Sequence, residues 1–364
     1  MFYGRAVLIK NLRETILNAP SGKSVVIYGQ KRTGKSSILY HLERQLADRF
    51  IPVKFSIGDI ANEPSVKTFL YTIVQKLSNA LVEHFPEFEE AERPSLSDLT
   101  QSPELVFYDY MDSVIRKLKR DQRSARFILL LDEFSYLYSG IWAETLPRTF
   151  MRFWKALLER GYFSAVLVGQ DSMPRFIDEF PNEFQVSQPE RVTYLAEEDA
   201  RRLIVEPIQI PETGESRYRG RAVERLLQLT SGSPYYIQIF CNRLVEYMNR
   251  NKAIYVTDAD IERVKQDLLR GQNALQPGQF DNLFSSGDEY TNTISVADAR
   301  AVLSQIAQHT RHQDYCEASL IQAHTSKPLD EILEDLVRRE VLEQQADTYR
   351  IRVGLFKEWL LESQ

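Results

Sequence analysis

The sequence predicts an α/β fold in which a mostly parallel sheet carries helices on both faces. Short apolar runs alternate with segments of helical periodicity between residues 24 and 195, and this alternation is typical of strand–helix–strand units. After residue 196 the strand-like runs almost vanish and helical patterns dominate. A second, helical part therefore follows the sheet.

The elements of the sheet part follow one another in a regular order. Each expected strand is short and rich in β-branched or other apolar residues, which is typical of strands buried on both faces. We expect these strands at residues 24–28, 51–57, 127–131, 164–168 and 191–195. The segments between them show helical spacing of apolar residues. We expect helices at residues 7–17, 35–49, 65–83, 104–119 and 148–159, and a surface loop at 86–103.

Three further units follow the sheet domain, which we bound at residues 1–196. Residues 197–270 form a helical domain, with helices expected at 198–205, 221–229, 234–249 and 258–269. Residues 271–294 are rich in Gly, Gln, Asn and Ser, which indicates a linker. Residues 295–364 have the order of a winged helix-turn-helix. We expect its helices at 296–308, 316–323 and 329–340 and its hairpin strands at 341–343 and 349–353.

The composition excludes several classes of protein. The 364 residues are 43% hydrophobic and 26% charged, which is the balance of a soluble globular protein, and no apolar run approaches the roughly 18 residues of a membrane-spanning helix. Two cysteines and five scattered histidines exclude a disulfide scaffold and a Cys-rich metal site, and they favour a cytoplasmic location. The net charge of −6 argues against a surface built to hold nucleic acid.

A glycine-rich loop follows the first expected strand. The segment GQKRTGKS fits the pattern GxxxxGK[ST] in full, and it lies between a buried strand and a helix. Its glycines let successive backbone N–H groups point at phosphate oxygens, and the start of the helix adds positive potential. We expect Lys35 to reach the β- and γ-phosphates of ATP and Ser36 to ligate Mg²⁺. The expected phosphate site comprises Gly29, Gln30, Lys31, Arg32, Thr33, Gly34, Lys35, Ser36 and Ser37.

Two carboxylates, Asp132 and Glu133, end the third buried strand, FILLL. In a parallel sheet the end of such a strand lies beside the phosphate loop. We expect Asp132 to hold Mg²⁺ and Glu133 to orient and activate the water that attacks the γ-phosphate. A solvated acidic pair or a helix cap is the alternative, and the phosphate loop favours the catalytic interpretation.

Taken together, these motifs resemble those of AAA+-type P-loop ATPases, and more narrowly the STAND group and the archaeal ATPases related to the origin-recognition proteins. The resemblance covers nearly the whole chain. FYGR at residues 2–5 is similar to the family's F-x-G-R element, which implies that Tyr3, Gly4 and Arg5 lie near the adenine. VLVGQ at 166–170 is similar to its sensor 1 strand, with Gln170 at the polar tip.

The helical part resembles the same family. GSPYY is similar to the GxP motif of the STAND lid, which implies that Gly232 and Pro234 lie near the nucleotide base. Tyr235 and Tyr236, which follow the proline, are equally interpreted as core residues of the lid. The end of the chain, from 347 to 360, resembles the family's C-terminal winged helix.

Two features depart from many AAA+ proteins. The GxP element stands where a sensor 2 arginine is common, which favours the STAND group. No arginine finger is evident either. Arg175 and Arg191 follow the sensor 1 strand, where a finger could lie, but we favour a surface salt-bridge role for each. Without a finger supplied by another subunit we expect slow turnover, because such an arginine is worth about 10³–10⁵ in rate.

The charge of the last domain argues against DNA. Residues 295–364 hold 12 Asp and Glu against 8 Lys and Arg, a net charge of −4. The expected recognition helix, residues 328–340, is mostly acidic, whereas a helix in the major groove lies among phosphates. Only Arg350 and Arg352 on the wing offer backbone contacts. We therefore favour a domain that packs on the ATPase core or on a partner. Its expected core residues are Ile332, Leu333, Leu336 and Val337.

The resemblance implies a nucleotide-operated switch. ATP or ADP with Mg²⁺ would bind between the sheet domain and the lid, and hydrolysis would change the docking of the lid and winged helix and the association with other copies or an effector protein. Control of assembly or signalling, including defence against stress or phage, is the expected process. Two alternatives remain: a DNA-binding initiator-like ATPase, and a scaffold that holds ADP permanently. No membrane partner is expected.

Overall fold

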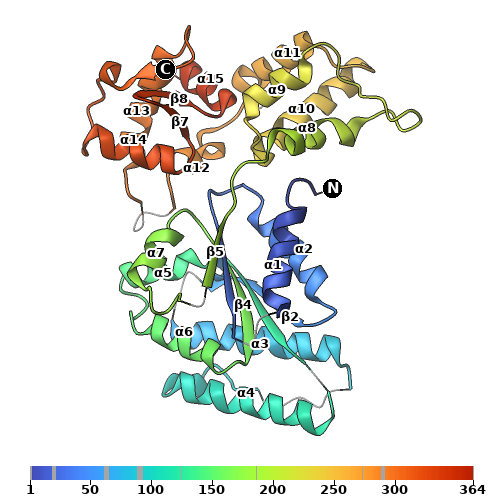
Figure 1. The fold of residues 1–364 in the computed structure, drawn as a ribbon, viewed down its shortest axis with the longest axis vertical. Coiled ribbons are helices and arrows are strands. Elements are labelled where there is room, and N and C mark those ends of the chain that lie inside the picture. The colour runs from blue at the N-terminus through green and yellow to red at the C-terminus, as the bar shows by residue number, and fades with distance from the viewer. Residues whose placement is uncertain are drawn as a thin grey trace.

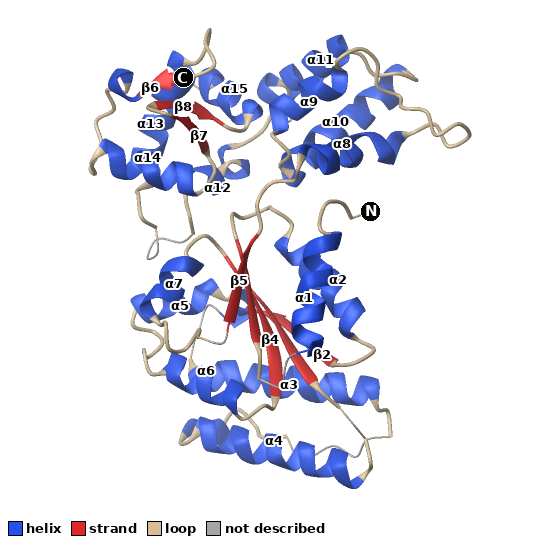
Figure 2. Ribbon diagram, viewed as in Figure 1, coloured by secondary structure: helices blue, strands red, loops and turns tan. Residues whose placement is uncertain are grey.

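The protein has two lobes, one built on a sheet and one mostly helical (Figure 1). The structure is a computed structural model that describes residues 2–18, 22–60, 65–87, 93–123, 125–185, 187–272, 274–287 and 292–363. We call residues 2–192 the sheet lobe and residues 194–363 the helical lobe. The carboxyl ends of the central strands point towards the helical lobe (Figures 1 and 2).

The sheet lobe is built on five parallel strands in the order β2-β3-β4-β1-β5. Strand β1, which leads into the phosphate loop, therefore lies between β4 and β5. The predicted mostly parallel sheet is confirmed. The strands are β1 (Ser24–Tyr28), β2 (Ile51–Ser56), β3 (Phe127–Asp132), β4 (Phe163–Gly169) and β5 (Ser187–Arg191).

Helices cover both faces of the sheet because consecutive strand residues point to opposite sides. Val25 and Ile27 pack with the core on one side, and Val26 packs with the core on the other. The first side carries α1 (Ala6–Asn18) and α2 (Lys35–Leu46). The second carries α3 (Val66–His84), α4 (Pro103–Arg120), α5 (Ser135–Trp142), α6 (Phe150–Glu159) and α7 (Met173–Glu179).

The helical lobe begins with four helices, which we call the lid: α8 (Glu197–Val205), α9 (Ala222–Thr230), α10 (Pro234–Asn251) and α11 (Asp258–Arg270). The C-terminal unit follows, with an antiparallel sheet in the order β6-β8-β7. Its elements are α12 (Asp281–Phe284), α13 (Val296–His309), β6 (Cys316–Glu317), α14 (Leu329–Arg338), β7 (Leu342–Gln345), β8 (Thr348–Ile351) and α15 (Gly354–Glu362). Short 3₁₀ helices lie at η1 (Ile57–Ile60), η2 (Asp98–Thr100), η3 (Glu206–Ile208), η4 (Pro277–Gln279) and η5 (Ala318–Leu320).

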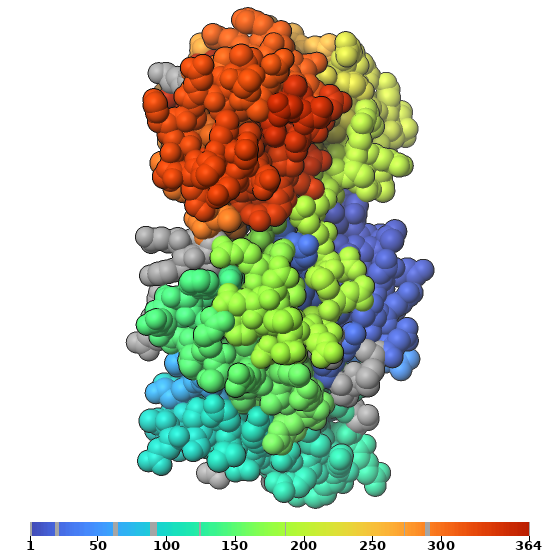
Figure 3. Space-filling view, turned by 60° about the vertical axis from the view of Figure 1, so that its left-hand side comes forward, coloured from blue at the N-terminus to red at the C-terminus, as the bar shows by residue number. Residues whose placement is uncertain are grey.

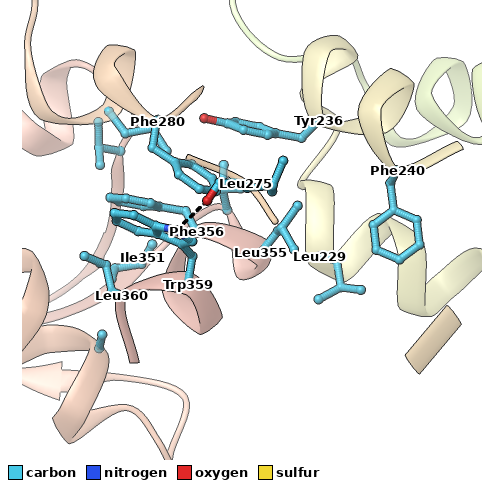
Figure 4. Packing of buried hydrophobic residues seen from close by; sticks show 14 of the residues in the cluster. Leu229, Tyr236, Phe240, Leu275, Phe280, Ile351, Leu355, Phe356, Trp359 and Leu360 are labelled. Carbon is cyan, nitrogen blue, oxygen red and sulfur yellow. Dashed lines mark hydrogen bonds between the residues drawn. The ribbon is translucent and has the colours of Figure 1, made fainter. Parts of the chain in front are cut away.

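The lid and the C-terminal unit share one hydrophobic core, which runs from Tyr194 to Leu360. Phe280 lies between the two, stacked on Tyr236 of α10 with ring centroids 5.5 Å apart and 4.9 Å from the ring of Trp359 (Figure 4). The indole of Trp359 donates a hydrogen bond of 3.1 Å to the Leu275 carbonyl. Because apolar burial is continuous here, these two parts form one packed body.

Three sequence predictions are corrected. The fifth strand lies at 187–191 rather than 191–195: its residues, SQPER, are polar because β5 is an edge strand that pairs only with β1. The helix expected at 316–323 is instead β6, which pairs with β8, followed by η5. The expected linker, 271–294, is not a free connection in its described part, since Leu275, Phe280 and Leu283 are buried; residues 273 and 288–291 lie outside the described residues.

Every helix in the described part of the chain is too short or too polar to cross a membrane.

Candidate functional site

The phosphate loop joins β1 to α2 in a conformation that glycine makes possible. Gly34, immediately before α2, has φ +92°, and Gly29 has φ +147°. A Cβ on Gly29 would lie 2.2 Å from the Val192 carbonyl oxygen, so only glycine fits there. The loop is further closed by a hydrogen bond of 2.9 Å from the Thr33 hydroxyl to the Gln30 carbonyl. The predicted strand–loop–helix setting is thus present.

Lys35 is a buried cation held by the loop itself. Its Nζ donates to the carbonyls of Gly29 at 2.9 Å and Gln30 at 2.6 Å. Burial lowers the pKa of Lys35 to about 8, although the carboxylates of Asp171 and Asp132 oppose this effect. A bound phosphate would supply the full counter-charge that backbone carbonyls lack.

The two carboxylates that end β3 lie at the carboxyl edge of the sheet, as predicted for strand ends in one parallel sheet. The Ser36 hydroxyl donates to Asp132 Oδ2 at 2.7 Å, which joins α2 to β3. Glu133 has φ +55°, and its Oε2 accepts a hydrogen bond from the hydroxyl of Ser56 at the end of β2. Gly58 lies close by, since a Cβ there would be 2.3 Å from Glu133 Oε2. Ser56 and Gly58 carry no local sequence signal and were not predicted.

The Ser36–Asp132 pair fits a magnesium ion. Both residues offer hard oxygen donors, and Mg²⁺ commonly takes one or two protein ligands and completes its shell with phosphate and water. Within the described residues no group of three or more His, Cys, Asp or Glu side chains forms a self-sufficient metal site. A metal held here would therefore depend on phosphate oxygens, as expected for a nucleotide-bound ion.

A cavity of about 300 Å³ extends from the phosphate loop to the lid. It is lined by three of the residues predicted to lie near the base, namely Tyr3, Arg5 and Pro234. Gly4 and Gly232 instead lie behind the lining: a Cβ on either would approach Leu195 to 2.7 and 2.5 Å, respectively. The other lining residues are Phe2, Arg32, Thr33, Gly34, Lys35, Ser36, Ser37, Leu195, Leu203, Tyr235 and Gln238.

Gln170 lies at the end of β4, where a sensor residue was expected. It is 5% exposed, and its backbone N–H donates to the Ser135 hydroxyl at 3.2 Å. Its Oε1 is buried without a hydrogen-bond partner. Such an orphaned acceptor is available to a bound ligand or water.

The helical lobe contacts the phosphate loop directly. Gln30 donates through Nε2 to the carbonyl of Arg339, just after α14, and accepts a hydrogen bond of 3.2 Å from the Tyr194 hydroxyl. Arg32 donates to the carbonyls of Gly278, at 3.0 Å, and Gln279. The Arg32 guanidinium also lies 4.3 Å from the ring centroid of Tyr235, which therefore serves the site as well as the lid. Tyr236, by contrast, is fully buried in the shared core.

The two arginines considered as fingers have other surroundings. Arg191 donates to the Arg338 carbonyl at 2.5 Å and lies 3.8 Å from both Asp171 and Glu340. Arg175 lies near Tyr138. Burial raises the pKa of the Tyr138 hydroxyl, and the positive charge of Arg175 opposes this effect. We call the contacts of Gln30, Arg32 and Arg191 with the helical lobe the seam, and Asp171 lies beside it. In the space-filling view the C-terminal unit sits directly over the sheet lobe (Figure 3).

Comparison with known proteins identifies the architecture. Residues 1–168 match the family model described as AAA ATPase domain. The Walker-type ATPase paby2304 of Pyrococcus abyssi has a similar structure, with a TM-score of 0.58 at 16% identity over 99% of this chain and 96% of that chain. Cdc6p from Pyrobaculum aerophilum reaches a TM-score of 0.47 at 13% identity over 99% and 94%, too low to establish a common fold. No curated protein sequence matches.

These findings, with the sheet order and the loop, show a P-loop NTPase fold of the AAA+ type, as the motifs predicted. The likeness to the Pyrococcus protein concerns the fold alone. The family match ends within β4, so β5 and the helical lobe lie outside it.

Proposed function

We propose that this protein is an ATP-binding, slowly hydrolysing molecular switch of the STAND type that controls assembly or signalling, for example in defence against stress or phage. In this proposal residues 1–196 are the ATPase domain, 197–270 the lid and 295–364 a winged helix. The residues 271–294 between them connect the two helical parts. ATP or ADP with Mg²⁺ occupies the cavity between the sheet lobe and the lid.

The chemistry follows from the side chains at the carboxyl edge of the sheet. Lys35 binds the β- and γ-phosphates, and Ser36 and Asp132 hold the metal, which neutralises charge on the phosphates. Glu133 orients the attacking water and accepts its proton. Ser56, hydrogen-bonded to Glu133, sets the direction of that carboxylate. Gln170 accepts a hydrogen bond from the attacking water through its free Oε1.

One observation carries the switch proposal: side chains of the phosphate loop hold the helical lobe. Gln30 and Arg32 lie within the loop that would wrap the phosphates, and both donate to backbone carbonyls of the helical lobe. A change in the loop on nucleotide binding therefore acts on the seam. The seam is polar whereas each lobe has its own apolar core, so the lobes can separate without exposing a core.

Slow turnover is supported by the position of Arg191, whose guanidinium is bound to the C-terminal unit in the seam. A DNA-binding role is not favoured. The exposed side chains of α14 are Asp330, Glu331, Glu334 and Arg338, so this face would repel phosphates. Ile332, Leu333 and Leu336 are buried as expected, and Val337 packs against them.

The test compares nucleotide binding by the protein and by a Lys35→Ala variant, using titration calorimetry with ADP and a non-hydrolysable ATP analogue. Lys10→Ala is the control, because Lys10 lies on α1, outside the phosphate loop, and is 73% exposed. We expect Lys35→Ala to lose binding and Lys10→Ala to keep it; unchanged affinity in Lys35→Ala contradicts the site.

Nucleotide released from the purified protein by denaturation, together with the hydrolysis rate, separates the switch from a permanent scaffold. Tightly retained ADP with no turnover would favour the scaffold.

A further inference from the structure

The seam contains a cluster of buried polar atoms that lack partners. Within the described part of the chain, the buried side-chain nitrogen and oxygen atoms without a hydrogen bond are Gln170 Oε1, Asp171 Oδ2 and Nη1 and Nη2 of Arg339. They belong to two segments only: the end of β4 and the residue after α14. Buried groups of this kind are costly unless something binds them.

Arg339 is the most unusual member of the cluster. It is 0% exposed, and its Nε donates to Asp335 Oδ2 at 2.7 Å. Asp335 is itself fixed by Thr293, whose hydroxyl donates to Oδ1 at 2.7 Å, and by Arg338. This support orients the guanidinium while both terminal amino groups stay free. A fixed guanidinium with two free N–H groups is suited to bidentate binding of a phosphate.

Backbone contacts place Arg339 beside the phosphate loop. Its carbonyl accepts a hydrogen bond from Gln30 of the phosphate loop. Arg191 Nη2 lies 2.5 Å from the Arg338 carbonyl and 3.8 Å from Asp171 Oδ1. The end of α14, the phosphate loop and the end of β4 therefore meet at one place.

Asp171 occupies this meeting point as an internal anion. Its side chain is 8% exposed, and the positive groups that act on it are Arg191, Lys35 and Arg339. Glu340 is the like charge nearby. The carboxylate thus balances the same lysine that a nucleotide phosphate would engage, at a point that Arg339 also reaches.

We propose that Arg339 is a phosphate-binding residue that the C-terminal unit supplies, within the same chain, to the nucleotide site. Its ligand is the terminal phosphate of a nucleoside triphosphate, bound through Nη1 and Nη2. This phosphate supplies the negative charge that the Asp171 carboxylate supplies in its absence. A diphosphate does not reach Arg339. This inference rests on the proposed function and gives it a residue that distinguishes ATP from ADP.

The experiment measures the dissociation constants of ADP and a non-hydrolysable ATP analogue, with Mg²⁺, for Arg339→Gln. The control is Arg311→Gln, which removes an exposed arginine of the same C-terminal unit, just after α13. We expect Arg339→Gln to weaken the triphosphate analogue by about tenfold to a hundredfold, as for a lost charge-assisted contact. ADP binding should change by less than about threefold. Arg311→Gln should change neither constant.

Equal loss for both nucleotides, or no loss in a folded Arg339→Gln protein, overturns the proposal. Arg339→Lys keeps the charge without the planar group. Its affinity for the triphosphate analogue should lie between those of Arg339→Gln and the unchanged protein. If both variants fail to fold, hydrogen exchange of the unchanged protein decides: residues 335–341 should exchange more slowly with the triphosphate analogue than with ADP, and identical exchange overturns the proposal. Failure of the nucleotide site as a whole would appear separately, as unchanged nucleotide affinity in Lys35→Ala.

Discussion

The Ser36 hydroxyl lies 2.7 Å from Asp132 Oδ2 and donates a hydrogen bond to it. This contact closes the carboxyl edge of the sheet, where α2, β3 and the phosphate loop converge. The two oxygens are thereby placed side by side before any ion arrives, so little side-chain ordering remains to oppose binding.

Replacing Glu133 by Gln should abolish hydrolysis while nucleotide binding persists. Glutamine keeps the shape and can still meet Ser56, but it cannot accept the proton of the attacking water. We expect the rate to fall by about 10²–10⁴, measured as phosphate release under single-turnover conditions. Retained activity would show that another group acts as the base.

Gly58→Ala should slow hydrolysis through Glu133 without touching the nucleotide. The new Cβ would lie 2.3 Å from Glu133 Oε2 and must displace that carboxylate. We expect a loss of about tenfold or more, as for other small misplacements of catalytic groups. The substitution should add nothing in a Glu133→Gln background, and additive effects of the two changes would contradict this coupling.

Nucleotide binding should take up a proton at alkaline pH. The pKa of Lys35 is lowered by burial to about 8, and a bound phosphate favours the charged ammonium. At pH 9 binding should then take up about 0.9 proton through this group, against about 0.1 at pH 7. Calorimetry in buffers with different ionisation heats measures this number, and Lys10→Ala, at an exposed position on α1, should keep it.

The lowered pKa of Lys35 also makes the free energy of unfolding depend on pH. Below pH 8 the lysine is charged in both the folded and the unfolded chain, and its burial costs stability. Between about 8 and the ordinary value of 10.5 the folded chain releases the proton first, so this group adds stability as the pH rises. Denaturant titrations of the protein and Lys35→Met should differ in slope in this range.

Gly354→Ala should destabilise the lid and the C-terminal unit together. A Cβ at Gly354 would lie 2.7 Å from the Gln228 carbonyl and 3.2 Å from the Cα of Leu229 in α9. Such overpacking costs about 1–3 kcal/mol. Hydrogen exchange should increase in both α9 and α15. Gly278→Ala, whose Cβ would find its nearest neighbour at 3.6 Å, is the control and should change little.

The sequence was sufficient for features that depend on local pattern. Four strands were predicted to within about one residue because apolar runs mark buried parallel strands. The meeting of Lys35, Ser36 and Asp132 also followed, since strand ends share one edge. Edge strand β5 lacks such a run. Helix α5, SYLYSGIW, is short and has no polar face to reveal its period.

The contacts of the seam could not be predicted because they join residues far apart in the sequence. Gln30 and Arg339 are 309 positions apart, and neither stands in a pattern that points to the other. Asp171 and Arg339 look like ordinary surface charges in the sequence, yet both side chains are buried in the fold. The sequence argument used only the net charge of residues 295–364. That sum does not reveal the buried ion pair between Asp335 and Arg339.

The hydrogen bonds from Gln30, Arg32 and Arg191 across the seam all end on main-chain carbonyls. Any amino acid supplies a carbonyl, so the receiving segments can diverge in sequence without losing attachment, provided their backbone path is kept. The donors have no such freedom. For these hydrogen bonds the sequence requirement therefore lies on the sheet lobe, while the helical lobe contributes the side chains of Tyr194, Tyr235 and Glu340. A helical lobe grafted from a diverged homologue should still attach to this sheet lobe if it keeps those three side chains and the same backbone.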